Sequence, residues 1–139
     1  FARPYKVIYE LAICSDLLLL GDPERAAQVY GRLDPDWATG RASRSLPAVI
    51  GALATEPVIR FGTTDQKSSV RDLLEPLSGT WAIVPIATLG PVDLSLGVLT
   101  AAEDTGPLSY FEKALAEAQR VGSVFWEAEI RRAAGDQLS

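Results

Sequence analysis

The chain has 139 residues, with 13 Lys and Arg against 18 Asp and Glu, which gives a net charge of −5. Hydrophobic residues make up 47% of it, a composition typical of globular domains that excludes a disordered chain. The scattered cations form no stripe for neutralising phosphates, so we expect no direct nucleic-acid binding.

Cys14 is the only cysteine and the chain has no His. An internal disulfide, His-based catalysis and most soft metal sites are therefore excluded. The longest apolar run, Leu17 to Leu20, is far too short for a membrane span, so we expect no membrane contact and a cytoplasmic location. The chain opens on Phe1 without an initiating Met, and we interpret it as a piece of a longer protein.

The first third predicts a helix pair over residues 4–35. Apolar residues at helical spacing predict a helix over 4–20, and Gly21 suits its C-cap. The run Asp22-Pro23-Glu24 predicts a new helix start, and that helix extends to about Leu33 before Asp34-Pro35 ends it. The very short connection predicts antiparallel neighbours.

The middle of the chain, residues 36–66, is irregular. Trp37 lies in a loop, where it either folds back over the core or contacts a partner. The spacing predicts a helix over 46–55, which Pro57 should kink or end, followed by a short turn through Phe61.

Residues 67–139 complete the predicted domain with further helices and one extended segment. A helix is predicted over 66–77, capped by Thr64 or Asp65. Residues 80–89 are rich in β-branched and aromatic types, but no partner strand is apparent and Pro85 lacks a donor. We therefore predict an extended linker, whose Trp81, Ile83 and Ile86 need cover from this core or from a neighbouring molecule.

The stretch from Gly90 to Gly122 predicts two packed helices, and a last helix follows over 124–138. The first of the two carries Val92, Leu96, Leu99 and Ala102 on one side and Leu94, Val98 and Ala101 on another, which predicts burial between neighbours. The second spans 107–121, and Gly122 suits its C-cap. Asp93 lies in the first turn of a buried helix, where it either stabilises the helix dipole or makes a polar contact in a groove.

Two helix pairs with a short Gly-containing turn resemble tetratricopeptide-type repeats. In the first pair, Gly21-Asp22 resembles the turn of the repeat, and Ala26 and Tyr30 its small and aromatic packing residues. Phe111 and Ala114 repeat that aromatic-then-small spacing in the second pair. The chain departs from the pattern in three places: the first helix lacks Trp and carries Cys14 at a small-residue position, the turn over 104–106 is short, and Pro107 replaces a small residue.

The carboxy-terminal part has a more specific resemblance. The runs GPVDLSLGVLTAA and YFEKALAEAQRVGS, followed by Trp126, are similar to the repeat region of large bacterial ATPase-type regulators, LuxR-type or adenylate-cyclase-linked. The resemblance covers residues 67–138 and, generically, 5–35. It implies an all-α fold of antiparallel helix pairs stacked as a short right-handed superhelix, without the nucleotide- or DNA-binding activity that lies in other domains of such proteins.

Catalytic chemistry finds no support in the sequence. No phosphate-binding glycine loop occurs, and the serines have no His to activate them. Asp34 and Asp36 lie in a turn where Asp is common, and Glu127 and Glu129 are two apart on a helix and do not face each other. We expect no catalytic residue, no cofactor and no metal.

The leading hypothesis is a single domain over 1–139 that acts as a non-catalytic protein-interaction or regulatory module of a bacterial signalling or transcription regulator. A small-molecule inducer-sensing domain and a purely structural scaffold are the alternatives. The expected partner is a protein, a peptide, a neighbouring domain of the parent chain or a small inducer, and exposed repeat ends would favour a homodimer. The candidate contact residues are Trp37, Trp81, Asp93 and Trp126.

Overall fold

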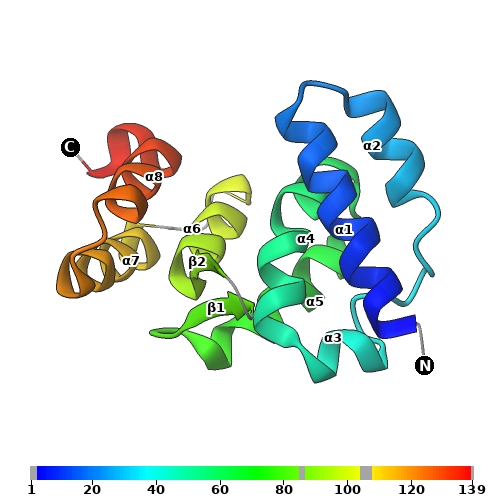
Figure 1. Cartoon of the computed structure of the whole chain (residues 1–139), viewed down its shortest axis with the longest axis horizontal. Coiled ribbons are helices and arrows are strands. Elements are labelled where there is room, and N and C mark those ends of the chain that lie inside the picture. The colour runs from blue at the N-terminus through cyan, green and yellow to red at the C-terminus, as the bar shows by residue number, and fades with distance from the viewer. Residues whose placement is uncertain (1–2, 85–86, 104–107, 139) are drawn as a thin grey trace.

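The computed structural model describes residues 3–84, 87–103 and 108–138, and these form a mostly helical domain with one small hairpin (Figure 1). The α-helices are α1 Arg3–Leu19, α2 Pro23–Tyr30, α3 Arg41–Ser45, α4 Pro47–Phe61, α5 Thr64–Leu74, α6 Val92–Ala102, α7 Leu108–Val121 and α8 Val124–Ala134. The strands are β1 Trp81–Val84 and β2 Ala87–Pro91, and 3-10 helices span Glu75–Leu77 and Gly135–Leu138.

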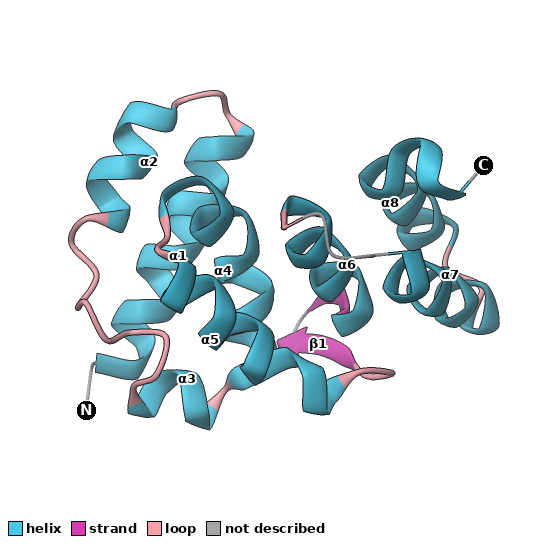
Figure 2. Ribbon diagram, turned by 180° about the vertical axis from the view of Figure 1, so that it is seen from behind, coloured by secondary structure: helices cyan, strands magenta, loops and turns pink. Residues whose placement is uncertain are grey.

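The turn between α1 and α2 forms as the sequence predicts. Gly21 has a φ of +80°, which suits a residue without a Cβ, and the backbone N–H of Asp22 reaches back to the carbonyl of Leu17 at 2.9 Å. The Asp22 carboxylate then accepts from the N–H of Arg25 at 3.2 Å and caps α2. The two helices pack side by side (Figure 2).

Helix α4 corrects the prediction for residues 46–61. It begins at Pro47 and continues through Pro57 to Phe61 instead of ending near 55. A proline inside a helix costs about 3 kcal/mol, but Ala54, Pro57 and Val58 are all buried, so core packing along this face offsets that cost.

The neighbouring boundaries also differ from the prediction. The short helix α3 lies between the predicted loop around Trp37 and the predicted helix over 46–55, in a stretch for which no helix was predicted. Helix α5 is capped by Thr63 and not by either predicted residue, Thr64 or Asp65, because Thr63 and Gln66 form a reciprocal capping box.

Strands β1 and β2 pair antiparallel, which corrects both the extended-linker prediction and the all-α fold class. Trp81 pairs with Pro91 and Val84 with Ala87, with an irregularity between Ala82 and Ile83. The missing partner strand lies in the same segment, because its two halves pair with each other. Pro85 and Ile86 fall between the strands and lie outside the described residues, as do the predicted short turn over 104–106 and Pro107.

Two hydrophobic cores are separated by α6 (Figures 1 and 2). The larger core consists of Leu11, Leu33, Trp37, Ala38, Ala42, Ile50, Ala54, Val58, Val70, Leu74, Val92, Leu96 and Leu99. The smaller core consists of Phe111, Ala114, Ala118, Ile130 and Ala134.

Helix α6 confirms the prediction of a helix apolar on two sides, except at Ala102, which is exposed. Its residues Val92, Leu96 and Leu99 belong to the larger core. Its residues Leu94, Val98 and Ala101 pack against the smaller core. Within the described part of the chain, no helix combines the length and apolar character needed to cross a membrane.

Candidate functional site

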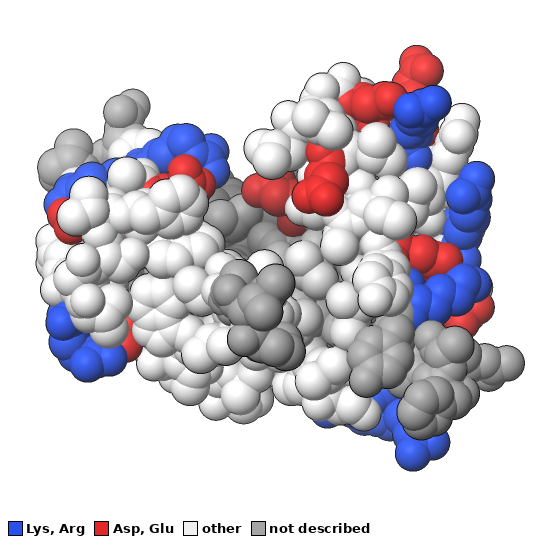
Figure 3. Space-filling view, viewed as in Figure 1, with Lys and Arg blue, Asp and Glu red and all other residues white. Residues whose placement is uncertain are grey.

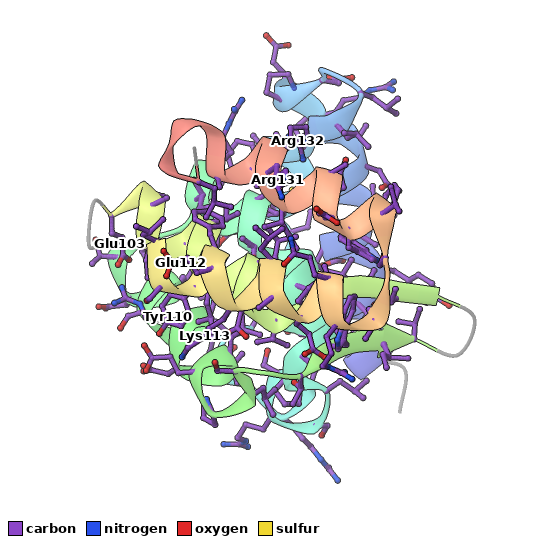
Figure 4. All side chains as sticks on the ribbon, turned by 90° about the vertical axis from the view of Figure 1, so that its left-hand side faces the viewer. Glu103, Tyr110, Glu112, Lys113, Arg131 and Arg132 are labelled. Atoms are coloured by element: carbon purple, nitrogen blue, oxygen red, sulfur yellow. The ribbon has the colours of Figure 1, made fainter. Side chains whose placement is uncertain are left out.

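The hairpin and the turn between α7 and α8 enclose a surface groove that we call the aromatic groove. Its volume is about 460 Å³, and it is largely open to solvent. The residues that line it are Trp81, Thr88, Arg120, Val121, Ser123, Phe125 and Trp126. Figure 4 shows the α7–α8 turn beside the hairpin, at the end of α7 opposite to the labelled Tyr110 and Lys113.

Local backbone geometry places the two aromatic residues of α8. Gly122 has a φ of +72°, and the N–H of Ser123 reaches the carbonyl of Ala118 at 2.9 Å, which ends α7 tightly. The Ser123 hydroxyl then accepts from the N–H of Trp126 at 3.2 Å and caps α8. Phe125 and Trp126 therefore lie in the first turn of α8, where both line the groove.

Gly90 lets the Trp126 ring approach the hairpin. Its φ is +102°, and a Cβ at this position would lie 2.7 Å from the Trp126 ring. Any other residue would therefore push the ring away from β2. The bare backbone of Gly90 forms the surface on which Trp126 packs.

Three aromatic rings form a continuous series in the groove. The Trp81 and Trp126 ring centroids are 6.4 Å apart with an interplanar angle of 77°, and Phe125 and Trp126 are 5.1 Å apart at 89°. Both pairs have the edge-to-face geometry that aromatic rings prefer. Phe125 is 65% exposed, and Val124, which precedes it in α8, is 80% exposed.

Glu117 on α7 fixes the polar edge of the groove. Its carboxylate accepts from Trp81 Nε1 at 3.0 Å and from Arg120 at 2.9 Å (Nε) and 2.6 Å (Nη2). Bonds from Arg120 first and from Trp81 second lower the pKa of Glu117 to about 2. The carboxylate is therefore ionised at neutral pH and holds the Trp81 ring against α7.

The structure brings two of the four predicted contact residues together. Trp81 and Trp126 both line the aromatic groove, although they come from different elements. Trp37 is only 3% exposed and lies in the larger core, where it packs edge-on against Tyr30 at 6.2 Å. Its Nε1 has no hydrogen-bond partner among the described residues.

Asp93 is only 1% exposed and lies away from the groove lining. Its carboxylate accepts from the Ser78 hydroxyl at 2.6 Å and from the N–H of Gly79 at 2.8 Å. It therefore joins the first turn of α6 to the turn that leads into β1. This contact sets where Trp81 begins the hairpin.

Sequence reasoning did not single out Glu117, Arg120 or Phe125. Glu117 and Arg120 carry a local signal, since an acid and a base three residues apart on one helix face can pair. The hydrogen bond between Glu117 and Trp81, however, joins residues 36 positions apart in the sequence. Only the fold of the hairpin against α7 reveals it.

Two further polar contacts lie away from the groove, one between α5 and the end of α6 and one within α7. Arg71 forms an ion pair with Glu103, and Lys113 lies 5.8 Å from the centroid of the Tyr110 ring (Figure 4). Burial, followed by the negative charges of Glu75 and Asp93, raises the pKa of Tyr110. Tyr110 also packs against the larger core, so α7 contacts both halves of the molecule.

The described residues include one buried thiol and no cluster of metal-binding side chains. No three or more His, Cys, Asp and Glu side chains in that part of the chain are grouped to hold a metal ion. Cys14 is buried, its thiol donates to the carbonyl of Ala26 at 3.4 Å, and burial raises its pKa to about 11. A thiol with so high a pKa is a poor nucleophile.

Charged side chains leave the middle of the α7–α8 end uncovered. On the face drawn in Figure 3, Lys, Arg, Asp and Glu gather at the margins of this end of the molecule in small mixed groups.

Compared with protein-family models, with curated proteins and with solved structures, the chain shows no match.

Proposed function

We propose that the chain is a non-catalytic interaction module and that its aromatic groove binds a segment of a protein partner. The observation that carries the proposal is the meeting of Trp81, Phe125 and Trp126 in one open surface groove. Tryptophan and other aromatic residues dominate the binding energy of protein interfaces. Phe125 is largely exposed and Trp81 and Trp126 are partly exposed, and such apolar surface is unfavourable in water unless it is covered on binding.

The openness of the groove favours a protein segment over a small inducer. Small-molecule sites bury about 70–90% of the ligand surface, which a groove that is largely open to solvent does not provide. A segment of polypeptide covers the groove by crossing it. In the scaffold alternative, a neighbouring repeat of the parent protein would fill the groove permanently.

We further propose that the module belongs to a cytoplasmic bacterial regulator and that its helix pairs are tetratricopeptide-like units of a right-handed stack. The close packing of α1 with α2 and of α6 with α7 supports this proposal, as does the buried Ala26 in α2. The position of α6 between two cores is the one expected of a helix inside such a stack. The resemblance over residues 67–138 supplies the link to regulators.

The experiment measures peptide binding by calorimetry for the intact chain and two variants. Phe125 and Tyr9 are matched, since both are aromatic, on helices and 65% and 66% exposed, but only Phe125 lines the groove. The peptides are a proline-rich, an alternating Val-Thr and an amphipathic helical sequence. We expect at least one to bind and Phe125→Ala to weaken it by about 10-fold or more, since hot-spot truncation costs about 2 kcal/mol.

Tyr9→Ala should leave the same affinity unchanged within about 2-fold, because the effect of an exposed side chain away from an interface is small. Equal losses for Phe125→Ala and Tyr9→Ala would show non-specific adhesion to exposed rings. That result, or the failure of all three peptides to bind, would overturn the proposal.

A further inference from the structure

We propose that the α7–α8 pair pivots on α6, so that its turn approaches and leaves the β-hairpin and changes the width of the aromatic groove. Two contacts hold the turn in its present position, and we call them the clasp. They are the hydrogen bond from Trp81 to Glu117 and the packing of Trp126 on Gly90. The inference concerns the free chain, so it goes beyond the proposed function and is tested without a ligand.

The two walls of the groove belong to different halves of the molecule. The hairpin supplies Trp81 and Thr88, and α7 and α8 supply the other lining residues. Strand β1 packs beside α4 with Ala82 fully buried, and Asp93 joins the turn before β1 to α6. The hairpin is therefore anchored in the half with the larger core, and a shift of α7 and α8 against α6 changes the width of the groove.

The end of the α7–α8 pair that lies away from the turn is tightly packed. Phe111, Ile130 and Ala134 are buried there in the smaller core. A Cβ on Gly97 of α6 would lie 2.7 Å from the Phe111 ring, and Tyr110, labelled at this end in Figure 4, packs against the larger core. Close-packed side chains leave little room for displacement, so this end is the pivot.

The turn end is loosely held by comparison. Val121, Val124 and Phe125 are all exposed, and the open groove of about 460 Å³ lies between the turn and the hairpin. A hydrogen bond of the kind that Trp81 makes contributes about 0.5–1.5 kcal/mol net. Thermal motion breaks such a contact far more often than it opens a buried core, so movement is expected at the turn and not at the pivot.

The test measures two distances with pairs of spin labels on cysteines at exposed positions, by electron paramagnetic resonance. The turn pair joins Ile83→Cys in β1 to Ala128→Cys in α8, and the pivot pair joins Asp72→Cys in α5 to Glu112→Cys in α7. The buried Cys14 does not compete for the label. Both distances are compared between the otherwise unmodified chain and variants of the clasp.

The first clasp variant removes the hydrogen bond. Trp81→Phe keeps an aromatic ring but has no N–H to donate to Glu117, so we expect the turn-pair distance to lengthen and its distribution to broaden. Tyr30→Phe is the control, because it removes a side-chain hydrogen bond, from Tyr30 to Gln66 at 2.7 Å, within the larger half. It should leave both distances unchanged.

The second clasp variant displaces the Trp126 ring. Gly90→Ala places a Cβ against that ring, so the turn should again move away from the hairpin. Gly79→Ala is the control, because Gly79 has a similar φ of +86° but no atom lies within 4 Å of the added Cβ. It imposes the same kind of backbone strain without touching the clasp, and the turn-pair distance should not change.

The pivot-pair distance should stay constant in every variant. A turn-pair distribution that is unchanged in both Trp81→Phe and Gly90→Ala would show that the turn does not move, and would overturn the inference. A change in the pivot pair as large as that in the turn pair would show that α7 and α8 leave α6 as a whole, which would also overturn it. Neither result bears on peptide binding, so the proposed function is judged separately.

Discussion

The two cores of the molecule are built from different kinds of residue. The larger core packs Leu, Ile and Val from α1, α4, α5 and α6 around the buried Trp37. The smaller core relies on Phe111 and Ile130, with alanines for the rest. Because alanine buries little apolar surface, the α7–α8 end gains less from burial than the α1–α5 end. It depends more on close approach of its helices.

The close contact between α6 and α7 holds the half of the molecule that carries most of the aromatic groove. At Gly97 in α6, an added Cβ would lie 2.7 Å from the Phe111 ring, so α6 and α7 approach each other closely here. Phe111 thus holds the α7–α8 end on α6, while α6 itself rests on the larger core. The groove residues of α7 and α8 lie on the half with the smaller core, which is the half expected to open first.

Phe111→Ala should have the largest effect and break the molecule at this boundary. Truncation of a fully buried Phe costs about 3–5 kcal/mol, and Phe111 is the largest of the buried residues of the smaller core. In native-state hydrogen exchange we expect protection in α7 and α8 to fall by about 10²–10³-fold. Protection in α4 and α5 should stay nearly constant.

Leu11→Ala is the matched change in the larger core, where Leu11 is fully buried. Its cost of about 2–5 kcal/mol should lower protection in both halves, since α6 loses its support when the larger core opens. Equal losses across the whole chain for both variants would show that the two cores open as one cooperative unit. The comparison drawn above would then be wrong.

The features encoded in local periodicity were predictable from the sequence. The two apolar sides of α6 follow directly from the spacing of Val92, Leu96 and Leu99 against Leu94 and Val98. The turn at Gly21-Asp22 has its own chemical signature. These elements are determined within a few residues, so no knowledge of the tertiary fold was needed.

The features that depend on distant residues were not predictable in the same way. Pro57 stays inside α4 only because the core packs along that face. The hairpin requires Trp81–Val84 to pair with Ala87–Pro91. The composition of this segment favours a strand, but it does not show that the two halves of the segment are each other's partners. Trp81 and Trp126 were both candidate contact residues, yet their meeting and the Glu117 bond arise only when the hairpin docks on α7.

Asp93→Ala should have an intermediate effect and sharpen the role of the turn that precedes β1. Removing the carboxylate leaves the N–H of Gly79 and the hydroxyl of Ser78 without their acceptor, which costs about 1–3 kcal/mol. We expect this loss of free energy in urea unfolding, together with a shift of the Trp81 indole NMR signal.

The exposed Asp72 provides the control for this change, and Asp72→Ala should alter stability by less than about 0.5 kcal/mol. A loss in Asp93→Ala that leaves the Trp81 signal in place would separate the turn from the groove. Asp93 would then stabilise α6 alone.

The smallest effect is expected from acid, at Glu117. Its folded-state pKa is about 2, below the ordinary value of 4.5, so the ionised carboxylate stabilises the folded state fully above about pH 4.5. That contribution is lost as the pH falls from 4.5 towards 2. The NMR signal of the Trp81 indole N–H, which donates to Glu117, should follow this titration. Glu117→Gln keeps an acceptor for Trp81 but removes the charge. In this variant the signal of the Trp81 indole N–H should not change between pH 4.5 and 2. A midpoint near 4.5 in the unmodified chain would show that neither Arg120 nor Trp81 holds the carboxylate in solution, and the polar edge of the groove would then be free to bind a charged ligand.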